Sequence, residues 1–330
     1  MRWRYKIIIV LAAMMLLIVA VLPYIPLNDL RLTVERNATE AVAAPVAISR
    51  LNLSVFPKFG VSISGLVVLD GETEKVRITA GSGHISMAVS PFLSGRLEPE
   101  NFAFRDIDLH LPELQRNGEE EPVHIDQMAG NVKIKGKDTI FSDWKMELYK
   151  GETFGEARFS RRDADKQTID GYVHAGDIQL LPLLQKFSGR KLLTGRLYSD
   201  LHFLSVGNSR STLKKNLVVD MQAHIIKGSI YGERMESTAA FLVGGNQTGT
   251  IPFERLSFQL LAKDQQAQAR KIEFISKSVS ARGNILVAAN RVLSGEIEAT
   301  GLGGLVKMDF ILTGTVEKPG VSLAPPVKGS

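Results

Sequence analysis

Six histidines and two pairs of closely spaced carboxylates are the residues of this chain that could carry out acid–base or metal chemistry. The histidines are His84, His110, His124, His174, His202 and His224. Zinc and hydrolase centres place such groups at set spacings, as in H-E-x-x-H or G-x-S-x-G, and the sequence contains neither motif. His124-Ile125-Asp126 resembles a ligand pair, but a solvent-facing pair on a strand explains it more simply. We therefore expect no metal site.

The carboxylate pairs and a glycine cluster also have structural explanations. Asp106-Ile107-Asp108 falls where the apolar phase shifts between Phe104 and Ile107, as at a β-bulge. Asp163-Ala164-Asp165 lies in a charged run that is typical of a hairpin tip. Gly301-Leu302-Gly303-Gly304 lacks the Lys-Ser/Thr that follows the glycines of a phosphate-binding loop. Since the chain also has no cysteine, we expect no catalytic residue, no cofactor and no enzymatic activity.

The positive charge of the chain does not indicate nucleic-acid binding. The net charge is +5, and Arg2, Arg4 and Lys6 supply three of the positive charges ahead of an apolar run. The other basic residues are scattered and are not interleaved with aromatic residues, as a nucleic-acid surface would require. We therefore expect no nucleic-acid partner.

The apolar run itself predicts a membrane anchor. Ile7 to Leu22 are sixteen consecutive apolar residues, which span ~24 Å as a helix, and continuation to Leu27 reaches ~31 Å, enough to cross a hydrocarbon core. The basic residues before it place residues 1–6 in the cytoplasm, with residues 7–27 as a single-pass anchor and the rest outside. The alternative is a cleaved signal peptide, but the first A-x-A pattern, Ala41-Val42-Ala43, lies far downstream of the run.

After the anchor, a helical spacing over residues 27–44 gives way to alternation. Apolar residues recur every second position in many short segments, which predicts strands with one apolar and one wet face. These segments are Leu51–Val55, Val61–Ile63, Val76–Ile78, Ile85–Val89, Ile107–Leu111, Val132–Ile134, Met146–Leu148, Leu217–Ile225, Leu256–Leu260, Ile272–Phe274, Val279–Ala281, Ile285–Val287 and Met308–Leu312. Turns are expected at Asp70-Gly71, Lys135-Gly136, Lys150-Gly151, Lys227-Gly228, Gly244-Gly245-Asn246 and Arg282-Gly283-Asn284. The fold class predicted is mainly β, a long antiparallel meander.

Two short helices and one linker interrupt the strands. Ile178–Phe187 and, more weakly, Ser209–Asn216 have helical spacing. The acidic segment 119–122 reads as a solvated linker between β subdomains at residues 28–118 and 123–323, and residues 324–330 are expected to be a disordered tail. The apolar face of such a sheet has to be covered. By the pattern alone a closed sandwich of two sheets is favoured, and a sheet curled around an apolar ligand is the alternative.

Three stretches of the chain resemble the AsmA-like family of Gram-negative envelope proteins. The first runs from the anchor through Ala44-Pro45-Val46-Ala47-Ile48 to Ser90-Pro91-Phe92-Leu93-Ser94-Gly95-Arg96-Leu97. The second combines Leu192–Leu197 with Ile226–Gly232, two glycine turns around an amphipathic helix. The third, Phe310–Leu323, is similar to the family's closing G-T-x-x-x-P strand.

The resemblance implies a twisted sheet curled into an elongated apolar groove, an inner-membrane anchor with the bulk in the periplasm, and a role in phospholipid movement for outer-membrane biogenesis. Phospholipid, the inner membrane and other envelope proteins would be the partners. Inward-facing apolar residues would line the lipid groove. We take these to be Ile85, Met87, Val89, Phe102, Phe104, Val219, Met221, Phe258, Leu260, Phe274, Ile285 and Val287. The alternative is a membrane-tethered scaffold for outer-membrane protein assembly or secretion, which would present strand edges to partners.

Overall fold

The structure is a computed structural model. It describes residues 28–42, 44–54, 58–71, 75–93, 98–110, 122–163, 166–188, 191–231, 250–301, 304–316 and 318–324. The expected anchor, the cytoplasmic residues before it, most of the acidic linker and residues 325–330 lie outside these ranges. Among the helices of the described ranges, none has the length and apolar character needed to span a bilayer.

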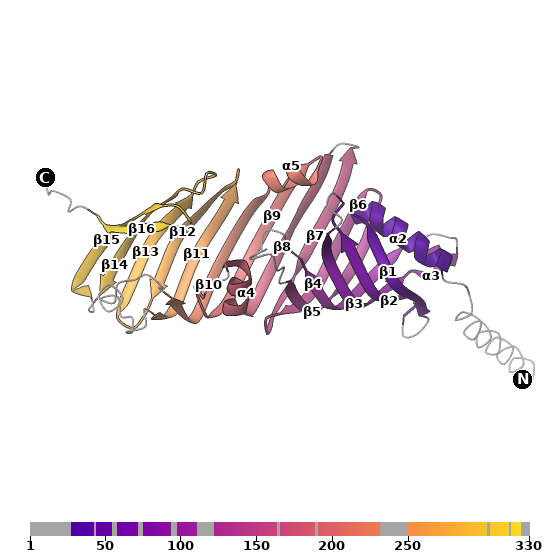
Figure 1. Ribbon diagram of the computed structural model, residues 1–330, viewed down its shortest axis with the longest axis horizontal. Helices are drawn as coiled ribbons and strands as arrows, with labels where there is room; N and C mark the ends of the chain where they lie inside the picture. The colour runs from indigo at the N-terminus through magenta and orange to yellow at the C-terminus, as the bar shows by residue number, and fades with distance from the viewer. Residues whose placement is uncertain are drawn as a thin grey trace, which may run out of the picture. The chain divides into compact units, whose positions relative to one another are not determined.

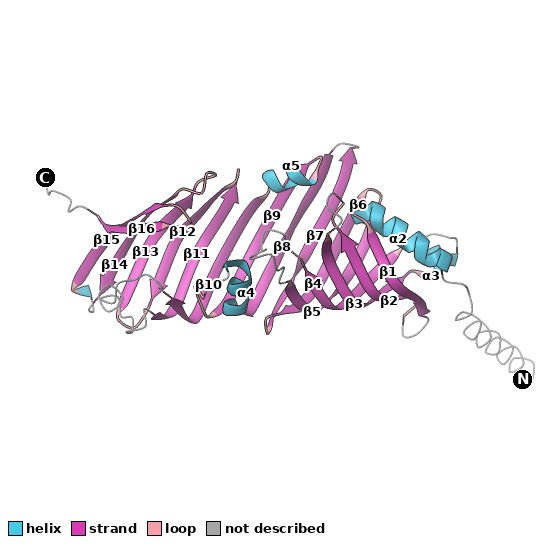
Figure 2. Cartoon of the chain, in the orientation of Figure 1, coloured by secondary structure: helices cyan, strands magenta, loops and turns pink. Residues whose placement is uncertain are grey.

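The chain divides into two compact units, Met1–Ile134 and Lys135–Ser330. Strands dominate both (Figures 1 and 2). The described elements of the N-terminal unit are α2 (Asn28–Val42), β1 (Val46–Ser54), β2 (Gly60–Leu69), β3 (Val76–Met87), α3 (Val89–Leu93), β4 (Pro99–Leu109) and β5 (Val123–Lys135). Each strand pairs antiparallel with its neighbours in the chain.

The C-terminal unit contains eleven of the described strands and two helices. They are β6 (Asp138–Leu148), β7 (Gly151–Asp163), β8 (Lys166–Gln179), α4 (Leu180–Ser188), β9 (Arg196–Gly207), α5 (Arg210–Lys215), β10 (Val218–Tyr231), β11 (Thr250–Lys263), β12 (Gln266–Ile275), β13 (Val279–Val287), β14 (Leu293–Gly301), β15 (Val306–Gly314) and β16 (Pro319–Leu323). The strand order follows the chain order and all ladders within the unit are antiparallel. In the described strand order, the first strand, β1, does not pair with the last strand, β16, so the sheet is open.

The prediction of a mainly β, antiparallel meander is confirmed, and so are the helices over 27–44, 178–187 and 209–216, within a few residues. Three details were wrong. Lys227-Gly228 and Arg282-Gly283-Asn284 are not turns but lie inside β10 and β13, and Val89 begins α3 and does not extend β3. Glycine in these strands marks close backbone approach, since a Cβ on Gly228 would lie 2.2 Å from the Thr194 carbonyl oxygen.

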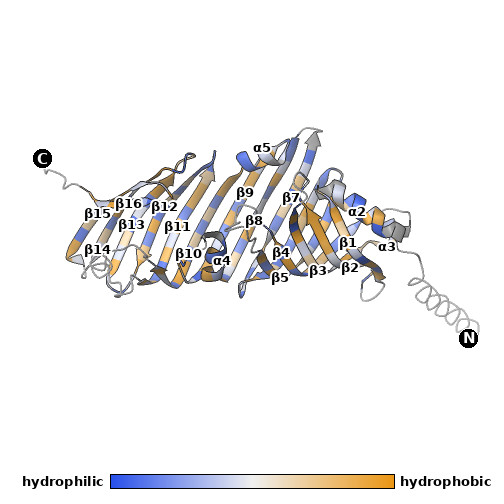
Figure 3. Cartoon of the chain, in the orientation of Figure 1, coloured by the Kyte–Doolittle hydropathy of each residue, from blue (hydrophilic) through white to orange (hydrophobic). Residues whose placement is uncertain are grey.

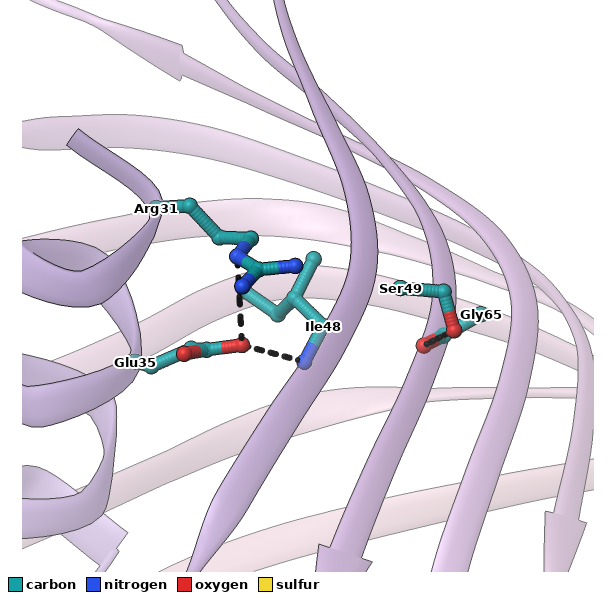
Figure 4. A network of polar contacts seen from close by, with 5 residues as sticks. All are labelled: Arg31, Glu35, Ile48, Ser49 and Gly65. Atoms are coloured by element: carbon teal, nitrogen blue, oxygen red, sulfur yellow. Dashed lines mark hydrogen bonds and ion pairs between the residues drawn. The ribbon is translucent and has the colours of Figure 1, made fainter. Parts of the chain in front are cut away.

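The helix α2 packs on the core of the N-terminal unit. Ile48, Leu51, Val61, Ile63 and Met87 form a buried cluster, and partly buried side chains including Val34 of α2 pack against it. Polar side chains of α2 also bind the edge of β1. Glu35 Oε1 accepts the Ile48 N–H at 2.8 Å (Figure 4). Thr39 Oγ1 accepts the Val46 N–H at 3.1 Å.

In all five N-terminal strands, the alternation of apolar and polar residues is interrupted at the same level, by one row of residues that crosses the strands. The row is Ser49, Gly65, Gly81, Asp106 and Asp126, each flanked by residues that pair with the neighbouring strand. Gly65 and Asp106 adopt positive φ, 65° and 53°. The phase shift expected at Asp106 is therefore real, but no extra residue is inserted there. Because every strand changes phase at the same level, the same face stays apolar on both sides of the row.

Gly65 provides a test of this row. Gly65 and Gly136 have nearly equal φ, 65° and 61°, but a Cβ on Gly65 would lie 2.6 Å from Ser49 Oγ, whereas one on Gly136 would meet nothing within 4 Å. Alanine at Gly136 should cost about 1 kcal/mol of unfolding free energy for the left-handed backbone alone. Alanine at Gly65 should cost clearly more. Urea unfolding of the two variants checks this, and equal losses would contradict a close contact at Ser49.

Candidate functional site

The apolar face of the C-terminal unit is built from side chains that stay in register from strand to strand. One line of directly paired residues, which we call row A, crosses all eleven strands. Row A consists of Trp144, Gly155, Val173, Leu201, Met221, Leu260, Ala269, Ile285, Gly295, Leu312 and Val321. Every member is apolar or glycine. At about 4.8 Å between strands, ten strand spacings make row A about 48 Å long.

A second line, row B, runs beside row A on the same face. Its members are Phe141, Ala157, Gly171, Phe203, Val219, Ala262, Ala267, Val287 and Leu293. All of them are again apolar or glycine. The alternation of hydrophobic and hydrophilic bands along the strands is visible in Figure 3. Together the two rows make a continuous apolar surface.

Most of this surface is half-buried. From Val173 to Leu312, every member of row A has intermediate exposure, and so does every member of row B. The helices lie at the ends of the strands. Leu180 of α4 is buried with Ile225 and Phe253, and Leu213 of α5 accepts a hydrogen bond from Ser205 at 2.6 Å. The side chains of rows A and B are thus shielded by their neighbours but not sealed.

Seven predicted lipid-lining residues lie on this face. Met221, Leu260 and Ile285 belong to row A, and Val219 and Val287 belong to row B. Met221 pairs directly with Leu260. The remaining two, Phe258 and Phe274, lie next to α4, where they pack against the cluster of Leu180, Ile225 and Phe253. The structure therefore brings together five of the seven on the half-buried surface.

The other five predicted residues lie in the N-terminal unit, in different surroundings. Met87 is 6% exposed and belongs to the sealed cluster, and Ile85 and Phe104 pack against that cluster. Phe102 is buried, with its ring 6.3 Å from that of Phe104. Val89 is exposed at the start of α3. These residues take part in a packed core or, for Val89, in a surface helix.

The opposite face of the C-terminal unit is polar and internally paired. His174 Nδ1 lies 2.6 Å from Asp200 Oδ1, and its ring stacks on that of Phe154 at 4.5 Å. His224 stacks on Tyr198 in the same way at 5.7 Å. The Tyr198 hydroxyl donates to Asp177 Oδ1 at 3.1 Å, and this hydrogen bond, with burial as a smaller cause, raises the pKa of Tyr198.

Two open hollows on the polar face are lined by charged side chains. One, of about 380 Å³, includes Glu273, Arg282 and Glu298, and the other, of about 340 Å³, includes Arg158 and His202. In the N-terminal unit, His124 Nδ1 lies 2.8 Å from Asp108 Oδ1, with Asp126 farther away at 3.8 Å from Nε2. In the part of the chain that the structure describes, no three histidine, aspartate or glutamate side chains are grouped as metal ligands.

Comparisons with family models, with curated proteins and with solved structures give no match to this chain.

Sequence reasoning missed the part of the apolar face contributed by β7, β8 and β9. Val173, Leu201 and Phe203 lie in rows A and B, yet the predicted strands left out this stretch of the chain. The apolar positions of β7 are largely small, as at Gly155 and Ala157, so hydrophobicity alone gives a weak signal there. The alternation of Leu197, Leu201 and Phe203 with polar residues is the signal that could have found β9.

A matched pair of methionines tests the difference between the two units. Met87 lies in a sealed core, and its replacement by alanine should lower the free energy of unfolding by about 2–5 kcal/mol. Met221 lies on the half-buried face, so alanine there should cost well under half as much. Denaturant unfolding of the two variants, followed by circular dichroism, makes the comparison. A loss at Met221 as large as that at Met87 would mean that the face is a packed core.

Proposed function

We propose that this protein is a non-enzymatic, membrane-anchored carrier that binds phospholipid acyl chains along the apolar face of its C-terminal unit. One observation supports the proposal above all others. No polar side chain interrupts row A from Trp144 to Val321, and the stretch from Val173 to Leu312 stays half-buried. A contiguous apolar surface that its own chain does not seal is typical of an interaction site.

The form of the surface favours a flexible chain over a compact ligand. Small rigid ligands are usually held in enclosed pockets with a few placed polar groups. Rows A and B are instead long, open and free of polar side chains. The hydrocarbon of one membrane leaflet is about 15 Å thick, half of a core of about 30 Å. Row A, at about 48 Å, could thus hold several acyl chains end to end while their headgroups remain in water.

The proposal includes a cellular location. Residues 7–27 would anchor the chain in the inner membrane of a Gram-negative bacterium, with the described units in the periplasm, as the resemblance to the AsmA-like family implies. The curled groove of that family would correspond to rows A and B. A carrier in that place would supply phospholipid for outer-membrane biogenesis.

Replacement of Met221 by glutamate tests lipid binding. The charge would lie beside Leu201 and Leu260 in the middle of row A. Since an acyl chain cannot solvate a carboxylate, we expect phospholipid that co-purifies with the detergent-extracted chain to fall about tenfold or more. Native mass spectrometry measures the bound phospholipid, and circular dichroism verifies that the variant is folded.

Gln222 supplies the matched control. It is the next residue of β10, is exposed, and pairs with Asp200 and Gln259 on the polar face. Glutamate at Gln222 should leave both lipid content and folding as in the parent chain. The carrier proposal fails if the parent chain binds no phospholipid, or if Met221→Glu and Gln222→Glu have equal effects. Phe258 is a poorer probe because it packs against the α4 cluster.

The proposed location and membrane orientation can be tested separately. A reporter enzyme that is active only in the periplasm, fused after Ser330, should be active, and the N-terminus of the mature protein should be at or near Met1. The basic residues Arg2, Arg4 and Lys6 are the reason for this orientation. A mature protein that begins after Ala43 would show a cleaved signal peptide and no anchor.

A tethered scaffold remains the second candidate, and the free edge of β16 is the observation that favours it. Proteins that recruit partners through β-augmentation present long, unguarded edges. Here β1 is guarded by α2, and β16 is five residues long and begins with Pro319. Guarded and short edges fit the carrier better.

A further inference from the structure

The two ends of the strand order differ in how their backbone groups are satisfied. At β1, the outward N–H groups of Val46 and Ile48 donate to side chains of α2, so a second strand cannot bind them. Figure 4 shows the bond from Ile48 to Glu35. At the other end, β16 pairs with β15, and no strand follows it in the described strand order. The start of β1 is therefore closed to another strand, whereas among the described residues no helix side chain is seen to hold the outer edge of β16.

The hydrogen-bond parity of β16 identifies the groups that are available. Ala324 donates its N–H to the Asp309 carbonyl oxygen at 2.7 Å, and Lys318 and Thr315 exchange backbone hydrogen bonds in the same ladder. The backbone N–H and C=O groups of the even-numbered residues of β16 thus point toward β15. Because backbone groups alternate sides along a strand, the N–H and C=O groups of Val321 and Leu323 point outward.

The side chains of the same two residues are among the most exposed apolar groups in the described chain. Val321 and Leu323 are each 65% exposed. Both lie on the apolar face, opposite Leu312 and Phe310 of β15. Ser322, between them, lies on the polar face and carries no charge. This edge therefore combines free hydrogen-bonding groups, exposed apolar side chains and no electrostatic barrier to a like surface.

We propose that two copies of this chain join edge to edge through antiparallel pairing of β16 with β16, about a two-fold axis at Ser322. Because α2 holds the N–H groups of Val46 and Ile48, it hinders head-to-tail addition of β16 to the start of β1, and two like edges that meet give a closed pair. With Ser322 opposite its counterpart, Val321 pairs with Leu323 of the second copy. The outward N–H and C=O groups of Val321 and Leu323 are then all paired.

A pairing centred on Val321 would leave the Leu323 carbonyl oxygen unpaired, because it would face Pro319, which has no N–H to donate. In the Ser322-centred register the unpaired group is instead the Pro319 carbonyl oxygen, at the start of the strand. The Ser322-centred register also covers each exposed valine with a leucine. In this register Val321, the last residue of row A in one copy, lies beside Leu323 of the other copy, which is paired with Phe310. The apolar faces of the two copies therefore become continuous. The pairing does not depend on lipid binding.

The contact is small. Stable dimers usually bury about 1,200–2,000 Å² in total, and a few paired residues on each side bury far less. We therefore expect the dimer to form reversibly at high local concentration. Its amount can be measured only after the two copies have been cross-linked. The absence of cysteine from the chain makes trapping direct, because a single introduced thiol has no competitor.

The test is disulfide trapping of the full chain carrying Ser322→Cys, purified in mild detergent and oxidised gently. Directly opposed residues of a non-hydrogen-bonded antiparallel pair have Cα atoms about 4.5 Å apart, within the range of about 4.4–6.8 Å that a disulfide spans. We expect most of the S322C protein to double in mass from the 36.2 kDa monomer on non-reducing gels. S294C, which replaces an exposed serine on the interior strand β14, is the matched control and should stay monomeric.

A second variant separates strand pairing from random collision. Leu323→Lys in the S322C background places a charged guard on the edge and should reduce the trapped dimer severalfold while the thiol stays reactive. The proposal is overturned if S322C stays monomeric with a reactive thiol, if S294C is trapped as efficiently, or if Leu323→Lys has no effect. Trapping of S322C to a different protein in place of a second copy would also overturn it.

Discussion

Strand register is the constraint on which the apolar face of the C-terminal unit depends. Successive side chains of a strand point to opposite faces, so a slip of one residue in any ladder would put polar groups into rows A and B. Bulges in β6, β8 and β12 insert a residue at Asp143, Asp177 and Lys271, each with positive φ. Each bulge returns the next apolar side chain to the same face. The local backbone strain thus preserves a long-range pattern.

The two units use the same amphipathic strands with different results. In the N-terminal unit, five strands change phase along one row and α2 closes the cluster around Ile48 and Met87. In the C-terminal unit, α4 packs on one part of the face, and the residues of rows A and B between the ends remain half-buried. The strand pattern is similar in both units, and the units differ in how far the apolar face is buried.

The spacing of apolar residues, every second position in strands and every third or fourth in helices, was enough to predict the fold class, the helices and many strands. It could not separate Met87 from Met221, because both alternate in the same way and differ only in what covers them. It also failed where glycine carries a packing role inside a strand, as at Gly228 and Gly283, since a glycine at a turn looks the same in sequence. Strands with small apolar side chains, such as β7, gave too weak a signal. Registers depend on pairing between strands and are not encoded in any one segment.

The side chains of α2 that bind β1 make the first strand better held than the last one. Glu35 and Thr39 hold Ile48 and Val46 from outside, in addition to the ladder with β2. At the opposite end, β16 is held by a single short ladder. Opening of a terminal strand requires the loss of only the contacts that hold it. We therefore expect local opening to begin at β16, so that its amide hydrogens exchange with solvent before those of Val46 and Ile48 in β1.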